Sequence, residues 1–120
     1  MKLHLDDHRH NQIQSYDLHN ITINGKIYTH SLVITPQSLK HWEIESFNQL
    51  TVHHFAEVIT SNPEIVLLGT GQKMQFPVLE LLAPLINQNI GFEVMNTPAA
   101  CRTYNLLVAE GRQVVAMLLL

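Results

Sequence analysis

Five different polar or reactive side chains follow one another from Cys101 to Asn105, and a purely solvated helix face would not require such a run. Arg102 carries a guanidinium group, which can bind anionic oxygens through two parallel hydrogen bonds. Together with the hydroxyl group of Thr70 or Thr97, it could clamp a small anion. The alternative is structural, because buried polar side chains in this run would hydrogen-bond the nearby glycine loop or the end of a strand.

Two short loops are predicted to lie at the carboxyl edge of a parallel sheet, where ligand sites of open α/β folds gather. Gly69-Thr70-Gly71 follows one predicted strand and Met95-Asn96-Thr97-Pro98 follows the next, each ahead of a helix whose first N–H groups could face an anion. The glycines lack the spacing of a dinucleotide or phosphate loop, and tight turning alone would also explain them. The candidate ligand-binding residues are Gly69, Thr70, Gly71, Thr97, Arg102, Thr103, Tyr104 and Asn105.

Cys101 is the single cysteine, so the chain has no internal disulfide. Its place near the start of a predicted helix would lower the pKa of the thiol. A cysteine nucleophile also needs a neighbouring base, and no histidine occurs after His54. We therefore interpret Cys101 as structural and assign no catalytic residue, which argues against an enzyme but leaves that alternative open.

The eight histidines all lie between His4 and His54. His4, Asp6, His8 and His10 are two residues apart, which would place them on one face of a strand. No zinc or facial-triad spacing accompanies them. The sequence therefore predicts hydrogen-bonded surface histidines and a polar arm over residues 1–12, with no metal site and no cofactor.

The composition favours one soluble domain over residues 13–120. Of 120 residues, 46% are hydrophobic and 14% charged, and the net charge is −3, which argues against disorder. No cluster of lysine and arginine is present to bind nucleic acid. The apolar run from Val114 to Leu120 is far shorter than the ~20 residues of a membrane span, so we expect no membrane insertion and a cytoplasmic location. A homodimer is compatible with this apolar content.

The first half of the chain is typical of strands. Alternating apolar residues lead to Ile21 and Ile23, and Asn24-Gly25 then predicts a tight hairpin turn. The returning strand is predicted over Lys26 to Thr35, with a bulge at its irregular centre, and Pro36 ends it. A short extended piece is predicted from Trp42 to Ile44.

The second half alternates between helical and strand patterns, which predicts a β-α-β-α-β sheet with parallel strands. A helix capped by Thr51 precedes it. The predicted strands cover Glu64 to Leu68, Phe92 to Met95 and Arg112 to Leu120; the predicted helices cover Pro77 to Gln88, with a kink at Pro84, and Pro98 to Gly111, capped by Asn96-Thr97.

The second half also resembles a small α/β family that includes a mitochondrial assembly factor for respiratory complex I and an adipogenesis-associated Mth-domain-containing protein. The resemblance rests on Leu68-Gly69-Thr70-Gly71, Phe76-Pro77, Ile90 to Met95, Thr97, Ala100 to Leu107 and Glu110-Gly111-Arg112. It implies a single-domain, three-layer β/β/α fold of the α/β class, with the N-terminal antiparallel β hairpin packed beside the β-α-β-α-β sheet.

The mitochondrial relative binds partner subunits, and no reaction is established for the family. The resemblance therefore implies a non-catalytic binding or assembly-factor-like module with a protein partner. The alternative is a small-molecule-binding or anion-binding protein, or an enzyme, that uses the cleft between the 69–71 loop and the helix over 97–105.

Overall fold

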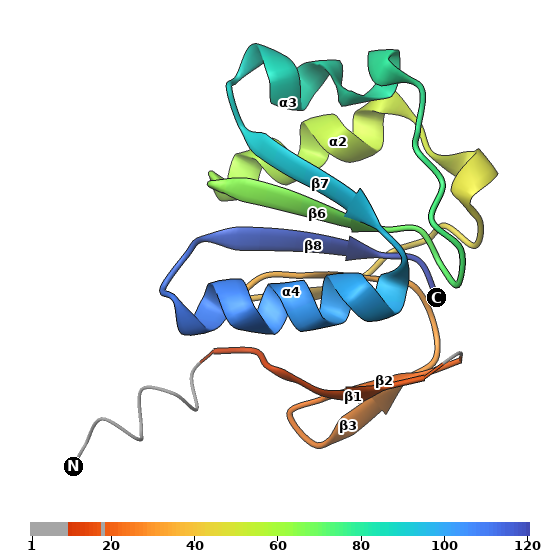
Figure 1. Cartoon of the computed structure of the whole chain (residues 1–120), viewed down its shortest axis with the longest axis vertical. Coiled ribbons are helices and arrows are strands. Elements are labelled where there is room, and N and C mark those ends of the chain that lie inside the picture. Colours follow the sequence, from red (N-terminus) through yellow and green to blue (C-terminus); the bar gives the residue numbers. More distant parts are fainter. Residues whose placement is uncertain (1–9, 18) are drawn as a thin grey trace.

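The computed structural model describes residues 10–17 and 19–120, which form two β-sheets and the helices around them (Figure 1). The smaller sheet is antiparallel, with the strand order β1-β2-β3. The larger sheet has the order β5-β4-β8-β6-β7; β6 pairs in parallel with both β7 and β8, and β4 pairs antiparallel with β8 and β5. The strands are β1 (Ile13–Tyr16), β2 (Ile21–Ile23), β3 (Lys26–Tyr28), β4 (Leu32–Ile34), β5 (Leu39–His41), β6 (Ile65–Gly69), β7 (Gly91–Met95) and β8 (Val114–Leu118).

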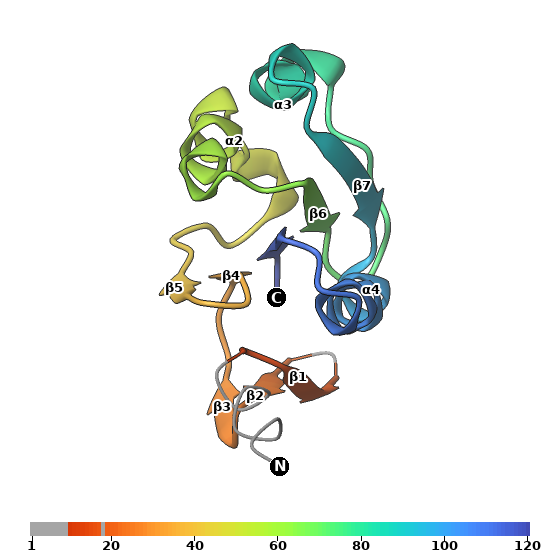
Figure 2. The same cartoon turned by 90° about the vertical axis from the view of Figure 1, so that its left-hand side faces the viewer.

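The larger sheet is covered on both faces, so the fold has three layers (Figure 2). One face packs against α4 (Thr97–Ala109) and the smaller sheet, and the other against α2 (Val52–Val58) and α3 (Ala83–Asn87). Successive residues of strand β8 point into the two different cores. Ala116 belongs to the core on the α4 side, Met117 belongs to the core on the α2 side, and both are fully buried. This architecture confirms the predicted fold class and the parallel β-α-β-α-β run.

Local signals set several element boundaries as predicted. Asn24 and Gly25 have φ values of 52° and 83°, as the tight turn between β2 and β3 requires. The side chain of Asn96 accepts a 2.8 Å hydrogen bond from the N–H of Ala99 and so caps α4. Thr51 precedes α2 in the extended conformation of an N-cap residue.

The prediction of one strand over Lys26 to Thr35 is wrong, because this stretch contributes a strand to each sheet. β3 ends at Tyr28, and β4 begins at Leu32 beside β8. The irregular centre, interpreted as a bulge, is the crossover between the sheets. Burial explains the division, since Leu32 and Ile34 are fully buried in the larger sheet whereas Ile27 is 64% exposed.

The prediction of one kinked helix over Pro77 to Gln88 is also wrong, both in where the helix starts and in the kink expected at Pro84. A short 3-10 helix, Leu79–Leu82, leads into α3, and Pro84 lies in the first turn of α3. A proline is tolerated there because the first N–H groups of a helix have no intrahelical partner. The extended piece expected from Trp42 to Ile44 is instead preceded by β5, Leu39–His41.

Candidate ligand-binding site

The end of β6 and the start of α4 touch one another at Gly69. A Cβ atom at this position would lie 3.0 Å from the Cα and Oγ1 atoms of Thr97 and 3.1 Å from the Cβ of Ala100. Gly69 therefore serves close packing of the helix on the strand, as predicted for a glycine whose role is structural. Gly71, with a φ of 97°, supplies the turn that follows.

The hydroxyls of Thr70 and Thr97, two of the three threonines in the predicted site, are engaged inside the protein. The Thr97 hydroxyl donates a 2.6 Å hydrogen bond to the carbonyl of Leu119 and accepts one of 2.8 Å from the N–H of Gly71. The Thr70 hydroxyl donates to the carbonyl of Lys73 at 2.7 Å and accepts from the N–H of Gln75 at 3.2 Å. Both residues are only 4% exposed, so these hydroxyls tie loops together.

Arg102 lies on the outer side of α4 and contacts the smaller sheet. Its Nη1 donates a 2.9 Å hydrogen bond to the hydroxyl of Tyr16, and its guanidinium carbon lies 6.0 Å from the centre of the Tyr16 ring. In the described chain, no hydrogen bond joins Arg102 to Thr70 or Thr97. Arg102 thus joins helix α4 to the smaller sheet through Tyr16. It does not form the clamp with Thr70 or Thr97 that the sequence suggested.

Tyr104 and Asn105 hold the segment that leads into β1. The Tyr104 hydroxyl donates a 2.9 Å hydrogen bond to the carbonyl of Asn11, and burial raises the pKa of this hydroxyl above its ordinary value. The Asn105 side chain both accepts from and donates to the backbone of Ile13. Thr103 donates to the sulfur of Met95 at 3.5 Å. The structural interpretation of this run predicted contacts with the glycine loop or a strand end. Thr103 contacts the end of β7 and Asn105 the start of β1, as predicted, whereas Tyr104 reaches Asn11 ahead of β1.

Cys101 is fully buried between α4 and the larger sheet. Burial raises the pKa of its thiol to about 12, although the nearby Arg102 acts in the opposite direction. Desolvation therefore outweighs the effect of the helix start, and the thiol stays protonated at neutral pH. This agrees with a structural cysteine.

Several histidines in the described chain make local contacts. His54 Nδ1 accepts a 3.0 Å hydrogen bond from the N–H of Thr51, and the rings of His30 and His41 stack with their centres 3.9 Å apart. Over residues 10–17 and 19–120, no group of three or more His, Cys, Asp or Glu side chains could hold a metal ion. The spaced residues His4, Asp6 and His8 lie outside the described residues.

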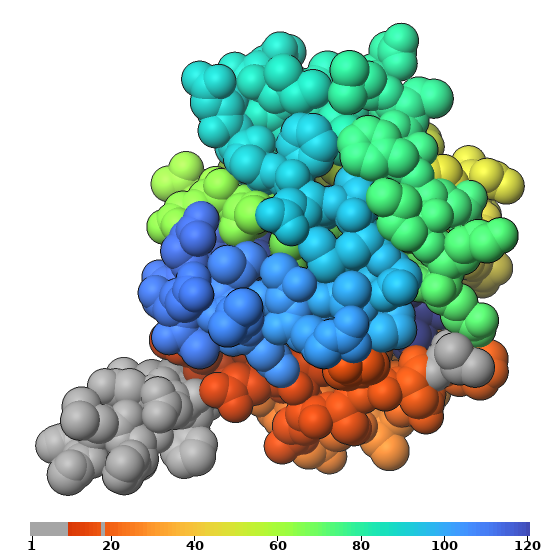
Figure 3. Space-filling view, viewed as in Figure 1, coloured from red at the N-terminus to blue at the C-terminus, as the bar shows by residue number. Residues whose placement is uncertain are grey.

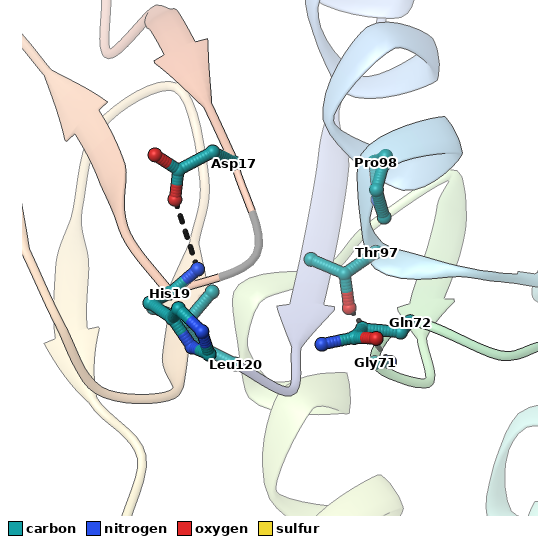
Figure 4. A pocket seen from close by; sticks show the side chains of 7 residues that line it. All are labelled: Asp17, His19, Gly71, Gln72, Thr97, Pro98 and Leu120. Carbon is teal, nitrogen blue, oxygen red and sulfur yellow. Dashed lines mark hydrogen bonds between the residues drawn. The ribbon is translucent and has the colours of Figure 1, made fainter.

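A hollow of about 290 Å³ opens at the carboxyl edge of the larger sheet, between the smaller sheet and the start of α4 (Figure 4). Of the predicted residues, Gly71 and Thr97 line it. The sequence reasoning missed Asp17 and His19, which reach it from the turn between β1 and β2. The full lining is Asp17, His19, Gly71, Gln72, Thr97, Pro98 and Leu120.

The Asp17 carboxylate at this hollow has local partners. It accepts hydrogen bonds from the N–H groups of His19, at 2.9 Å, and Asn20, at 3.1 Å, and these bonds hold the pKa of the carboxyl below its usual value. Aspartate favours turns because its side chain can hydrogen-bond the backbone two residues on, as Asp17 does with His19, and Asp17 could have marked this corner. The carboxylate shapes the turn and adds a negative charge to the rim of the hollow.

An exposed apolar segment follows β6. It consists of Met74, Phe76, Val78 and Leu79, which are 50%, 54%, 64% and 59% exposed, while Pro77 between them is buried. The green region of Figure 3 shows this part of the chain at the surface. Val78 falls within the helix predicted over Pro77 to Gln88, but in the structure it precedes the 3-10 helix and is exposed. We call these four residues the 74–79 patch.

The family model described as "Protein of unknown function (DUF498/DUF598)" matches residues 13–119. The chain belongs to this family. The match covers both sheets and all of the candidate residues, and it confirms the resemblance found in the sequence. The family's description names no reaction, so membership by itself assigns no chemistry to the hollow.

Relatives and a solved structure agree with this assignment. The chain is 31% identical to the "13 kDa major membrane protein" of Francisella tularensis over 77% of this chain and 76% of the relative. It is 33% identical to "NADH dehydrogenase [ubiquinone] 1 alpha subcomplex assembly factor 3" of Rattus norvegicus over 89% of this chain and 59% of the relative, so it spans less than two thirds of that protein. A crystal structure of a Bordetella parapertussis protein is similar with a TM-score of 0.87 and 32% identity, over 92% of this chain and 95% of that one.

The described residues include no helix that is both long enough and apolar enough to cross a membrane.

Proposed function

We propose that this chain is a non-catalytic, protein-binding module that acts as an assembly factor. The observation that carries the proposal is the 74–79 patch, in which four large apolar side chains are each at least half exposed. Contiguous exposed apolar surface on a small protein marks an interaction site, and Met and Phe are enriched at such interfaces. The similarity to complex I assembly factor 3 supports the same conclusion and directs the search for partners to respiratory NADH dehydrogenase subunits.

The engagement of the polar candidates supports a binding role further. Nucleophilic or acid–base catalysis needs a reactive group with a base in reach and a site for the substrate. Cys101 is buried and protonated, and the hydroxyls of Thr70 and Thr97 hold the fold together. The 74–79 patch remains exposed and available for another molecule, and its apolar side chains suit a protein partner.

The test is quantitative affinity capture with the tagged full chain from cells that naturally make it. Val78→Ser removes apolar surface from the patch, and Ile27→Ser is its matched control, because both side chains are 64% exposed and Ile27 lies in β3. We expect the wild type and Ile27→Ser to retain the same partner and Val78→Ser to lose it. Equal capture by all three proteins, or recovery of the tagged chain alone, would contradict the proposal.

A second candidate function, binding of a small molecule or anion, is favoured by the hollow at the carboxyl edge of the sheet. Thermal unfolding in the presence of sulfate, nucleotides and small carboxylic acids tests it. A ligand at about 100 times its dissociation constant adds about 2.7 kcal/mol of stability. A stabilisation that Gln72→Ala abolishes would support this function, and the absence of any shift would reject it.

We further propose that the chain works in the cytoplasm. The relative named as a membrane protein in Francisella gives a reason to test this location directly. Fractionation of native cells should recover the chain in the supernatant after high-speed centrifugation. Recovery with the membranes, resistant to high salt, would contradict a cytoplasmic location.

A further inference from the structure

Strand β7 forms one edge of the larger sheet and hydrogen-bonds to β6 on one side only. The Gly91 N–H donates to the carbonyl of Glu64, and the Met95 carbonyl accepts from the N–H of Thr70. Because backbone groups alternate in direction along a strand, residues 91, 93 and 95 direct theirs to β6. The N–H and C=O groups of Phe92 and Val94 therefore point away from the sheet.

These outward groups have no partner within the described chain, since no hydrogen bond to Phe92 or Val94 exists outside the β6 ladder. Figure 3 shows the light-blue part of the chain around β7 at the surface, between α3 above and α4 below. An edge with free donors and acceptors is a template for an added strand.

Two features beside this edge describe what would fit it. Glu93 is exposed at the centre of β7 and forms no ion pair within the described residues. The segment that carries the 74–79 patch runs beside the carboxyl end of β7 in both Figure 1 and Figure 2. An incoming strand would thus meet hydrogen-bonding groups, one negative charge and an apolar surface.

We propose that β7 is the docking edge for an extended segment of the partner protein, with a lysine or arginine opposite Glu93 and apolar residues toward the 74–79 patch. This inference rests on the proposed protein-binding function and names the chemistry of the partner. Main-chain hydrogen bonds to Phe92 and Val94 give the segment its affinity. The charge pair with Glu93 gives it direction and selectivity.

A second copy of the chain fits the edge less well. Two antiparallel β7 strands that used all the outward groups would pair Phe92 with Val94 of the other copy and would place the two Glu93 side chains opposite one another. Like charges directly opposite on neighbouring strands are destabilising. The net charge of −3 on each chain adds repulsion. A positively charged segment of another protein removes both penalties.

The test uses ¹⁵N-labelled full-length protein and a synthetic seven-residue peptide of alternating valine and threonine with a central lysine. We expect this peptide to shift the amide signals of Phe92 and Val94 and to slow their hydrogen exchange. A matched peptide with a central glutamate should bind about two- to fivefold more weakly, and Glu93→Lys should reverse this order. A lysine peptide with N-methylated backbone amides should leave both signals unchanged.

Three outcomes would overturn the inference: no change at Phe92 and Val94, equal binding of both peptides, or shifts that depend on protein concentration without any peptide. The last result would assign the edge to a second copy. The capture experiment with Val78→Ser reads the proposed function separately. If capture of the partner depends on the 74–79 patch but the peptides do not change the signals of Phe92 and Val94, the proposal that β7 is a docking edge is rejected. The proposed protein-binding function then still stands.

Discussion

The side-chain amide of Asn105 pairs with both backbone groups of Ile13, 92 residues away in the chain. Its Oδ1 accepts from the N–H of Ile13 at 3.0 Å, and its Nδ2 donates to the carbonyl of Ile13 at 2.7 Å. The amide thereby serves the free edge of β1 as one residue of a neighbouring strand would. Tyr104 contacts Asn11 and Arg102 contacts Tyr16 in the same way. The polar side chains of α4 therefore attach residues 11–16 to the helix.

Asn105→Ala should lower the free energy of unfolding by about 2–4 kcal/mol, because it leaves two partly buried backbone groups without partners. Urea unfolding followed by circular dichroism measures the change. Leu106→Ala is the control and should cost less than about 1 kcal/mol, because Leu106 is 61% exposed on the same helix. Equal losses of unfolding free energy in the two variants would show that the hydrogen bonds of Asn105 to Ile13 do not stabilise the fold.

Thr97→Val keeps the shape of the side chain but removes the hydroxyl that links Leu119 to Gly71. We expect a loss of about 2–3 kcal/mol, since the Gly71 N–H and the Leu119 carbonyl both lose a partner. Thr97→Ser retains the hydroxyl and should cost less than about half of that. A Thr97→Val protein of unchanged stability that no longer binds an anion would contradict the structural role and restore the ligand site.

The fold could be predicted largely because its signals are local and repeated. The apolar run from Glu64 to Leu68 indicates a doubly covered strand, and the Asn24-Gly25 turn fixes a hairpin, whatever the rest of the chain does. The division between β3 and β4 could not be predicted in this way. It depends on which sheet buries Leu32 and Ile34 better, and their pairing with β8 joins residues far apart in sequence.

Gly69→Ala should destabilise the protein by about 1–3 kcal/mol, because the new methyl group would press against the backbone of Thr97 at the start of α4. Gly91→Ala is the control, since a Cβ there would meet its nearest atom, the Glu64 carbonyl oxygen, at 3.6 Å. Thermal unfolding of both variants measures the difference. A Gly69→Ala protein as stable as Gly91→Ala would contradict the close approach of β6 and α4.

The buried thiol of Cys101 should make stability fall at high pH. Burial raises its pKa in the folded state to about 12, so above the ordinary thiol pKa the unfolded chain releases a proton that the folded chain retains. The stabilising contribution is complete below the ordinary thiol pKa and is lost as the pH rises toward the folded value. Between pH 7 and pH 10 the wild type should lose about 2 kcal/mol more unfolding free energy than Cys101→Ala. Parallel pH curves for the two proteins would show that the thiol is hydrated in the folded state.

The candidate site was only partly predictable for a related physical reason. The sequence places Gly71 and Thr97 at the carboxyl edge of the sheet, because parallel strands end there, and both line the hollow. It does not show that their polar atoms find partners, since the Leu119 carbonyl and the Asn11 backbone approach only once the layers have packed. The exposure of Val78 was not predicted, because Val78 falls within the helix predicted over Pro77 to Gln88, whereas residues 74–78 have no regular secondary structure and a 3-10 helix begins only at Leu79.

One quantitative capture experiment tests most directly whether the partner binds the 74–79 patch or the hollow. Val78→Ser changes the 74–79 patch, and Gln72→Ala changes an exposed residue that lines the hollow. We predict that Val78→Ser reduces the recovered partner about tenfold, as expected for an anchoring apolar contact worth about 1.4 kcal/mol, while Gln72→Ala leaves it unchanged. Loss of the partner with Gln72→Ala and full recovery with Val78→Ser would contradict the account and place the function at the strand ends.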